Sequence, residues 1–165
     1  MATEVLVGLL GGRFDGPVNQ VNAMHLAQRQ GINVTAARSD DAGDYRTLAT
    51  LRGQGPQGAV TVAGTLFDER LPRLVRIGEL PVEAVLEGVL LVTRHEDRPG
   101  VVAGVGAALA ASGCNIARMH LGPVGDRGLA MAVIGLDAPV PDPVLAAIRE
   151  VEAVLAVHQV DLRGA

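Results

Sequence analysis

The chain of 165 residues contains no lysine and no tryptophan, and it has a single cysteine and only three aromatic residues. The formal net charge is −4 and its signs are interspersed, so there is no basic patch of the kind that binds nucleic acid. The lone cysteine, Cys114, excludes an internal disulfide and a cysteine-based zinc cluster. Nearly half of the residues are hydrophobic, and their core must therefore be aliphatic.

Signals for export or membrane insertion are also missing. The longest uncharged stretch, 101–117, falls short of the ~20 apolar residues that a membrane-spanning helix needs. The first residues lack the basic segment that opens a signal peptide. The sequence therefore predicts a cytoplasmic protein.

The second half of the sequence alternates between strand and helix periods. Strands are rich in β-branched residues, helices repeat apolar residues every three or four positions, and Gly113 suits a helix C-terminus. Pro99 suits a first helical turn, and Asp142 suits an N-cap before Pro143. The order βαββαβ is that of a ferredoxin-like fold. Its predicted elements are a strand at 88–95, a helix at 99–112, strands at 115–121 and 129–136, a helix from 143 to about 154, and a strand at 157–162.

The first half is less regular, and a connector at 79–83 separates it from the second. Its first predicted element is a helix with no strand before it, which indicates that an upstream piece is missing. We place the boundary between the two domains, 1–86 and 87–165, in this region. The predicted elements of the first half are helices at 4–10 and 21–30 and strands at 32–37, 45–52, 59–66 and 73–77.

The hexapeptide His-Glu-Asp-Arg-Pro-Gly at 95–100 joins a predicted strand to a predicted helix. The first N–H groups of a helix lack intrahelical partners and carry partial positive charge, so they can hold a carboxylate. Asp97 can accept hydrogen bonds from an ammonium group, His95 can bond to a hydroxyl, and Asn115 offers both a donor and an acceptor. A small amino acid matches these groups. The alternative is a capped turn without a ligand.

Five segments occur in an order and approximate spacing that resemble the C-terminal regulatory part of the D-3-phosphoglycerate dehydrogenase family. The resemblance implies an α+β fold in which a small partial α/β intervening domain precedes a ferredoxin-like βαββαβ ACT domain. It also implies that the catalytic domains, and with them NAD, lie outside this chain, which is either a fragment or a separate regulatory polypeptide. The segments are Val21-Asn22-Ala23, Ala63-Gly64-Thr65-Leu66-Phe67, Pro72-Arg73-Leu74-Val75-Arg76-Ile77, His95-Glu96-Asp97-Arg98-Pro99-Gly100 and Asn115-Ile116-Ala117-Arg118-Met119.

The resemblance further implies an effector pocket between two ACT domains that pair edge to edge in a homodimer or higher oligomer. The usual effector in the family is L-serine, and the neighbouring subunit supplies the asparagine. Asp97 departs from the family, whose better-known members often have asparagine there, so the identity of the effector stays a hypothesis. The residues assigned to the pocket are His95, Asp97, Pro99, Gly100, Asn115 and Ile116.

Other candidate sites are weaker. Arg70, Arg73 and Arg76 surround a predicted strand and form either a solvated face or, by resemblance to the intervening domain, an anion site. The glycines at 104–109 begin like a dinucleotide fingerprint but lack its last small residue, which argues against nucleotide binding. The histidines are too scattered for a metal site. No nucleophile or acid–base pair stands in a catalytic context, so we expect no metal and no reaction in this chain alone.

Three functions remain open. The first is an amino-acid-sensing regulatory part of the dehydrogenase. The second is a dimerisation tether whose pocket is vestigial. The third is a regulatory part of an iron–sulfur L-serine dehydratase, against which the lone cysteine argues because a cluster needs several thiolates.

Overall fold

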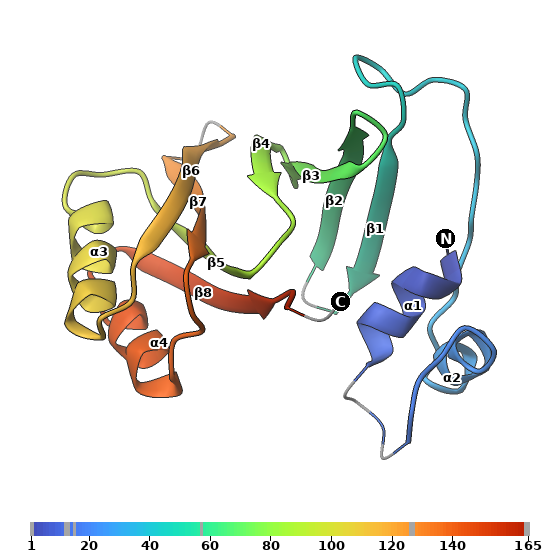
Figure 1. Cartoon of the computed structure of the whole chain (residues 1–165), viewed down its shortest axis with the longest axis horizontal. Helices are drawn as coiled ribbons and strands as arrows, with labels where there is room; N and C mark the ends of the chain where they lie inside the picture. Colours follow the sequence, from blue (N-terminus) through green and yellow to red (C-terminus); the bar gives the residue numbers. More distant parts are fainter. Residues whose placement is uncertain (1, 12–13, 15, 57, 126–127, 164–165) are drawn as a thin grey trace. The chain divides into compact units, whose positions relative to one another are not determined.

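The computed structural model describes residues 2–11, 14, 16–56, 58–125 and 128–163 (Figure 1). The chain divides into two compact units, Met1–Asp41 and Ala42–Ala165. The division between residues 86 and 87 stays a prediction.

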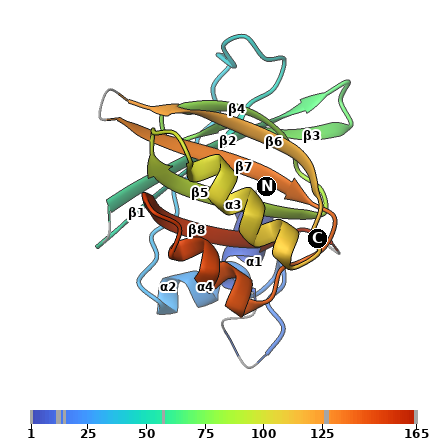
Figure 2. The ribbon, with the colours of Figure 1, turned by 90° about the vertical axis from the view of Figure 1, so that its left-hand side faces the viewer.

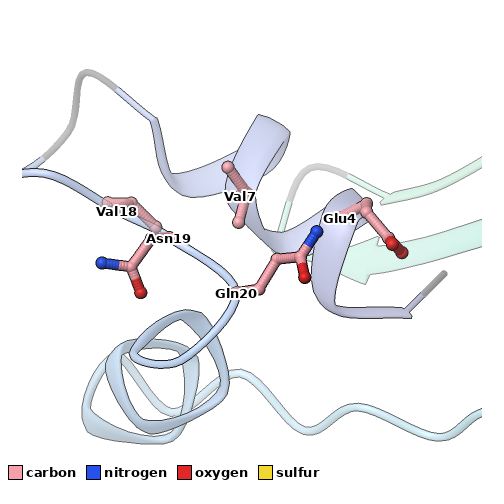
Figure 3. Close-up of a pocket in the computed structure, with 5 residues that line it drawn as sticks. All are labelled: Glu4, Val7, Val18, Asn19 and Gln20. Atoms are coloured by element: carbon pink, nitrogen blue, oxygen red, sulfur yellow. The ribbon is translucent and has the colours of Figure 1, made fainter.

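The first unit contains two helices, α1 (Ala2–Leu10) and α2 (Ala23–Arg29), so both predicted helices of this region are confirmed. Its core consists of Leu6 and Leu10 from α1 and Ala23 and Ala27 from α2. A turn precedes α2, in which the backbone N–H of Asn19 donates to Asn22 Oδ1 at 2.8 Å. A hollow of about 320 Å³ lies between α1 and this turn, and Figure 3 shows the residues around it. It is lined by Glu4, Val7, Val18, Asn19 and Gln20.

The strand predicted at 32–37 is wrong. Residues 33–39 adopt no regular secondary structure and are exposed. A strand forms only where its backbone N–H and C=O groups meet those of a neighbour. Alternating β-branched residues therefore did not suffice here, because no strand in the described residues pairs with this segment.

The second unit begins with an antiparallel sheet in the order β1-β2-β3-β4. Its strands are β1 (Ala49–Gly55), β2 (Gly58–Phe67), β3 (Leu71–Ile77) and β4 (Leu80–Val85). The connector predicted at 79–83 is therefore wrong, because most of it lies in β4. Leu80, Val82 and Ala84 alternate with exposed residues and are buried. Pro81 misled the prediction, but β4 is an edge strand, where a missing N–H is tolerated.

The second sheet of this unit has the order β6-β7-β5-β8 and is also antiparallel. Two helices pack against one of its faces (Figure 2), which gives the predicted ferredoxin-like βαββαβ arrangement and confirms the α+β fold class. The elements are β5 (Val89–Glu96), α3 (Val101–Ala111), β6 (Ile116–Val124), β7 (Leu129–Leu136), α4 (Asp142–Arg149) and β8 (Val154–Asp161).

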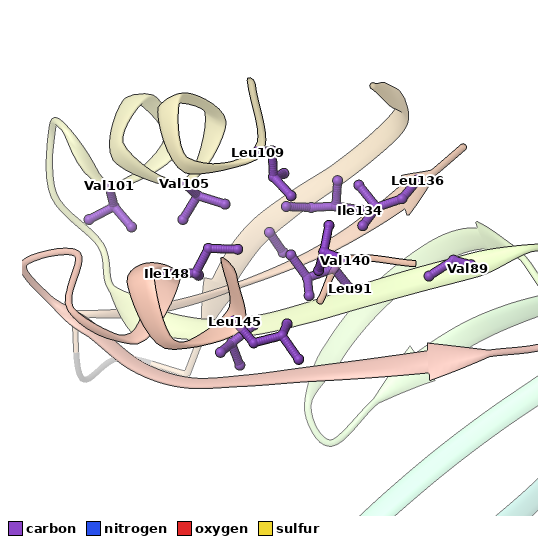
Figure 4. Close-up of a cluster of buried hydrophobic side chains, with 12 residues drawn as sticks. Val89, Leu91, Val101, Val105, Leu109, Ile134, Leu136, Val140, Leu145 and Ile148 are labelled. Carbon is purple, nitrogen blue, oxygen red and sulfur yellow. The ribbon is translucent and has the colours of Figure 1, made fainter. Parts of the chain in front are cut away.

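The hydrophobic cluster between these helices and the sheet consists of aliphatic side chains (Figure 4). Leu91 on β5, Leu109 on α3, Ile134 on β7 and Ile148 on α4 are almost completely buried. Gly104 brings α3 close to the residues that follow α4, since a Cβ at this position would lie 2.6 Å from Val151 Cγ1.

The C-terminus of α3 matches its prediction. Gly113 has a positive φ of 73°, and the N–H groups of Gly113 and Cys114 donate to the carbonyls of Ala110 and Leu109. These two bonds form the Schellman motif that glycine favours at this position.

Three predicted helix boundaries are corrected. Helix α3 begins at Val101 after the cap residue Gly100, so Pro99 lies before its first turn. Asp142 is the first residue of α4 and not its N-cap, which is Pro141. Helix α4 ends at Arg149, because the chain turns at 150–153 and Ala153 adopts a φ of 74°.

Replacing Ala153 with glycine is expected to raise the free energy of unfolding by about 1 kcal/mol. The left-handed conformation costs a non-glycine residue roughly 1–2 kcal/mol, and glycine avoids this cost. Urea denaturation measures the difference. The control is Ala110→Gly on the exposed side of α3, which should lower stability by about 1 kcal/mol. An Ala153→Gly protein that is no more stable than the wild type would contradict the strain.

Candidate functional site

The turn between β5 and α3 is held from both sides by backbone hydrogen bonds. The N–H of Glu96 donates to the carbonyl of Ala153 at 3.0 Å, and the N–H of Asp97 donates to the carbonyl of Gly128 at 2.8 Å. Arg98 also pairs with Glu152 at 2.7 Å. The turn therefore has a defined position between the loops that precede β7 and β8.

His95 is the last residue of β5 whose side chain points to the helix-covered face, and only 3% of it is exposed. Its Nδ1 lies 2.8 Å from the carbonyl oxygen of Glu96. A carbonyl can only accept a hydrogen bond, so this contact places the proton of the neutral ring on Nδ1 and leaves Nε2 as an acceptor. His95 can therefore accept a bond from a hydroxyl or an ammonium group.

The N-terminus of α3 supplies donors next to this acceptor. Gly100 is the N-cap residue of the helix, with a φ of 98°, and among the described residues no side chain bonds to the N–H groups of the first turn. The first intrahelical bond of α3 runs from the N–H of Gly104 to the carbonyl of Gly100. The N–H groups of the first helical turn are consequently available to an anion such as a carboxylate.

Asp97 adds an exposed carboxylate to the same turn. Within the described part of the chain it has no ion-pair partner, whereas the neighbouring Arg98 is shared between Glu96 and Glu152. The turn therefore carries unpaired negative charge at Asp97. Such a carboxylate attracts an ammonium group and repels a second anion.

Asn115 and Ile116 lie at the opposite end of the sheet from this turn. Ile116 pairs with Leu136 and His95 pairs with Ala130, six residues apart along β7. At the rise of an extended strand this separation is about 20 Å. One chain therefore brings together His95, Asp97, Pro99 and Gly100, but it does not bring Asn115 or Ile116 to them.

The free edge of β6 offers a way to join the two groups. Strand β6 is an edge strand, and it runs parallel to β5 because both are antiparallel to β7. If the β6 strands of two chains paired antiparallel, the start of one would lie beside the end of the other. Val124, at the end of β6, is level with Glu96, since both pair with Leu129. Such a pair would place Asn115 of a second copy level with the turn along the strand direction.

Asp137 is a positioning residue that sequence reasoning missed. Its Oδ1 accepts the backbone N–H of Asn115 at 3.0 Å and lies 3.5 Å from Cys114 Sγ. It therefore fixes the segment that carries Asn115. The only sequence signal was an acidic residue directly after a strand, and the contact spans 22 residues.

The predicted anion site stays a prediction. The register of β3 shifts at Val75, so Arg73 and Arg76 lie on one face of the sheet, opposite Thr65 and Ala63 of β2. Arg73 lies over the ring of Phe67, with its guanidinium carbon 5.8 Å from the ring centre. Arg70 lies in the turn before β3.

The part of the chain that the structure describes contains no group of three or more histidine, cysteine or acidic side chains placed to hold a metal ion. None of its helices is long and apolar enough to cross a membrane.

Cys114 reports on the contact with Asp137. Burial raises the pKa of the Cys114 thiol above its usual value, and the hydrogen bond to Asp137 raises it further. Less thiolate is therefore present at a given pH. Asp137→Asn should lower this pKa and speed alkylation by iodoacetamide at pH 8 by about threefold, since the thiolate is the reactive form. The control, Asp161→Asn, removes a carboxylate that pairs with Arg163 instead. Equal rates in both variants would count against the contact.

Comparison with known proteins agrees with the fold. Residues 1–78 match the family model of the D-3-phosphoglycerate dehydrogenase intervening domain, and residues 88–153 match that of the ACT domain. D-3-phosphoglycerate dehydrogenase from Synechocystis is 30% identical over 98% of this chain and 29% of its own length. The enzyme of the same name from Bacillus subtilis is 28% identical over 96% of this chain and 30% of its own length.

The chain thus spans about 30% of the length of the curated relatives it matches. Among solved structures, the ACT domain of the GTP pyrophosphokinase from Chlorobium tepidum aligns with 45% of this chain and 97% of its own. The TM-score of this alignment is 0.37 and the identity is 16%. The two family models together thus match most of this chain, that of the D-3-phosphoglycerate dehydrogenase intervening domain over residues 1–78 and that of the ACT domain over residues 88–153.

Proposed function

We propose that this chain is the amino-acid-sensing regulatory part of a cytoplasmic D-3-phosphoglycerate dehydrogenase and that its effector is L-serine. The observation that carries the proposal is the set of groups at the β5–α3 turn. An acceptor nitrogen on His95, a carboxylate on Asp97 and unbonded N–H groups at the start of α3 lie in one short segment.

These groups complement the three polar groups of serine. The carboxylate of the ligand binds the N–H groups of the first turn of α3, where the helix dipole favours negative charge. Its ammonium group binds Asp97, and its hydroxyl donates to His95 Nε2. Glycine and alanine lack the hydroxyl, so they make no bond to this acceptor and should bind more weakly than serine.

A second copy of the chain completes the pocket in this proposal. The edge of β6 presents Met119 and Leu121, which are 37% and 45% exposed on the helix-covered face. An uncovered apolar edge strand is a template for pairing with another strand. Antiparallel pairing of two β6 strands supplies Asn115 from the neighbour, so each pocket belongs to both chains.

Regulation follows if serine binds one arrangement of the paired chains more tightly than another. A ligand shifts such an equilibrium only by its differential affinity for the two states. A ligand shared between two subunits has this property, because it binds tightly only when both contribute. The dehydrogenase activity, with its NAD and its phosphorylated substrate, would belong to separate catalytic domains.

The second candidate is a dimerisation tether that binds no effector. One observation favours it: the turn is already fixed by the bonds from Glu96 and Asp97 and by the ion pair of Arg98. A turn held in this way needs no ligand. The two candidates differ only in whether amino acids bind.

Isothermal titration calorimetry with L-serine, L-alanine and glycine is the test. We expect heat from serine at submillimolar to millimolar concentrations and weaker binding of the other two. Asn115→Ala should weaken serine binding by about 1–3 kcal/mol, because a hydrogen-bonded partner is lost from a closed pocket. The control is Asn33→Ala, which truncates an exposed asparagine in the first unit.

Sedimentation of the same samples separates the two candidates. A dimer that gives no heat with any of the three amino acids is the tether, and the sensor proposal is then wrong. Loss of serine binding in both asparagine variants would also contradict the assigned pocket.

A further inference from the structure

Strand β6 is in contact with the other sheet of the same unit. Its residues 118, 120 and 122 point to the sheet face that carries no helices, and β4 lies against this face (Figure 1). His120 Nε2 lies 3.2 Å from the carbonyl oxygen of Pro81 in β4. Arg118 Nη2 donates to Glu87 Oε1 at 2.9 Å, in the link between β4 and β5.

An apolar cluster lies beneath these polar contacts. Leu80, Val82 and Ala84 of β4 pack with Val133 of β7, and Leu74 and Ile77 of β3 lie against them. Gly122 of β6 makes room for the strand, since a Cβ there would lie 2.8 Å from Leu80 Cδ1. We call this contact the seam. In it, β4 and the side chains of Leu74 and Ile77 pack against β6 and β7.

The sheet β1–β4 depends on the seam, because β1, its edge strand on the side away from the seam, buries little. Every residue of β1 is exposed. Leu51 on β1 and Val60 on β2 lie on the same face as Leu80 and Ile77, yet they are 43% and 61% exposed. Apolar burial on this face is thus concentrated at β3 and β4. Segments with so few buried contacts open at low free energy.

We call the sheet β6-β7-β5-β8 the ACT sheet. Its two edge strands differ in how they contact β4. Strand β6 contacts β4 through one face, bonds to β7 along one edge and leaves the other edge free. Strand β8, at the opposite edge, has no comparable contact with β4 among the described residues. Local opening of β6 therefore weakens the seam directly, whereas local opening of β8 does not.

We infer that β6 couples the free edge of the ACT sheet to the sheet β1–β4, so that ordering this edge also orders β3 and β4. The coupling element is the seam, and both ends of the coupling are local opening equilibria of the kind that links sites without a large structural change. For the effect of serine this inference rests on the proposed function. The coupling itself is a property of the chain without ligand.

Hydrogen–deuterium exchange of the full chain tests the coupling without ligand. Leu121→Gly loosens β6, and the matched Leu155→Gly loosens β8, where the side chain is similarly exposed (45% and 49%). We expect Leu121→Gly to speed exchange of residues 71–85 by about threefold or more, since a loosened support raises the open population. Leu155→Gly should leave this segment at the wild-type rate. Equal effects of the two variants, or none from Leu121→Gly, overturn the inference.

A second arm adds serine and the variant His120→Ala, which removes the bond to Pro81 and lies outside the turn. In the wild type, serine should slow exchange in β6 and in residues 71–85. In His120→Ala, it should slow β6 alone, with the calorimetric affinity for serine kept within about threefold. If serine binds and slows β6 but leaves residues 71–85 unchanged in the wild type, the inference is wrong. If serine gives no heat, the proposed function fails, and the comparison of Leu121→Gly with Leu155→Gly still decides the coupling.

Discussion

The structure of the second unit depends on one aliphatic layer between α3, α4 and the ACT sheet. Leu91, Leu109, Ile134 and Ile148 are almost fully buried there, and no aromatic side chain contributes. Apolar burial of this kind is the dominant favourable term in folding. Its consequence for the site is geometric, because the layer fixes the start of α3 directly after the end of β5.

The chemistry of the turn follows from that placement. Since the N-cap residue of α3 is Gly100, which has no side chain, the donors of the first turn receive no bond from the cap residue. His95, as the last inward residue of β5, is buried beside them with its Nδ1 bonded to Glu96. Among the described residues, the same packing that makes the fold stable therefore leaves His95 Nε2 and the N–H groups of the first turn of α3 open to a ligand.

The sequence predicted the ACT half of the fold well because its signals are local. A Schellman glycine at 113 and clean apolar periods over β5, β7 and α3 do not depend on distant residues. The errors fall where a distant partner decides. Residues 32–37 have strand-like alternation without a neighbouring strand, and β4 forms despite Pro81 because β3 and the ACT sheet hold it.

The residues of the candidate site were also predictable only where they are close together in the sequence. His95, Asp97, Pro99 and Gly100 are adjacent in sequence, so their proximity was predictable. The distance of Asn115 from them was readable only from the strand register, and the bond from Asn115 to Asp137 joins residues 22 positions apart. Contacts of this separation leave no pattern in a single sequence. The resemblance to a family supplied the hypothesis that the asparagine comes from a second chain, which the residues alone could not.

Strand β6 connects the parts of the second unit described above. Its two faces and one edge are already engaged or partly covered, by β4, by the helix layer and by β7. The charged residue of this edge strand, Arg118, is paired with Glu87, while Met119 and Leu121 leave apolar surface exposed beside it, and exposed apolar edges pair readily with other strands. Proteins that keep an edge of this kind open risk aggregation, and this supports the proposed pairing of β6 with a second chain. In the proposed dimer, β6 would connect the turn between β5 and α3, the second subunit and the sheet β1–β4.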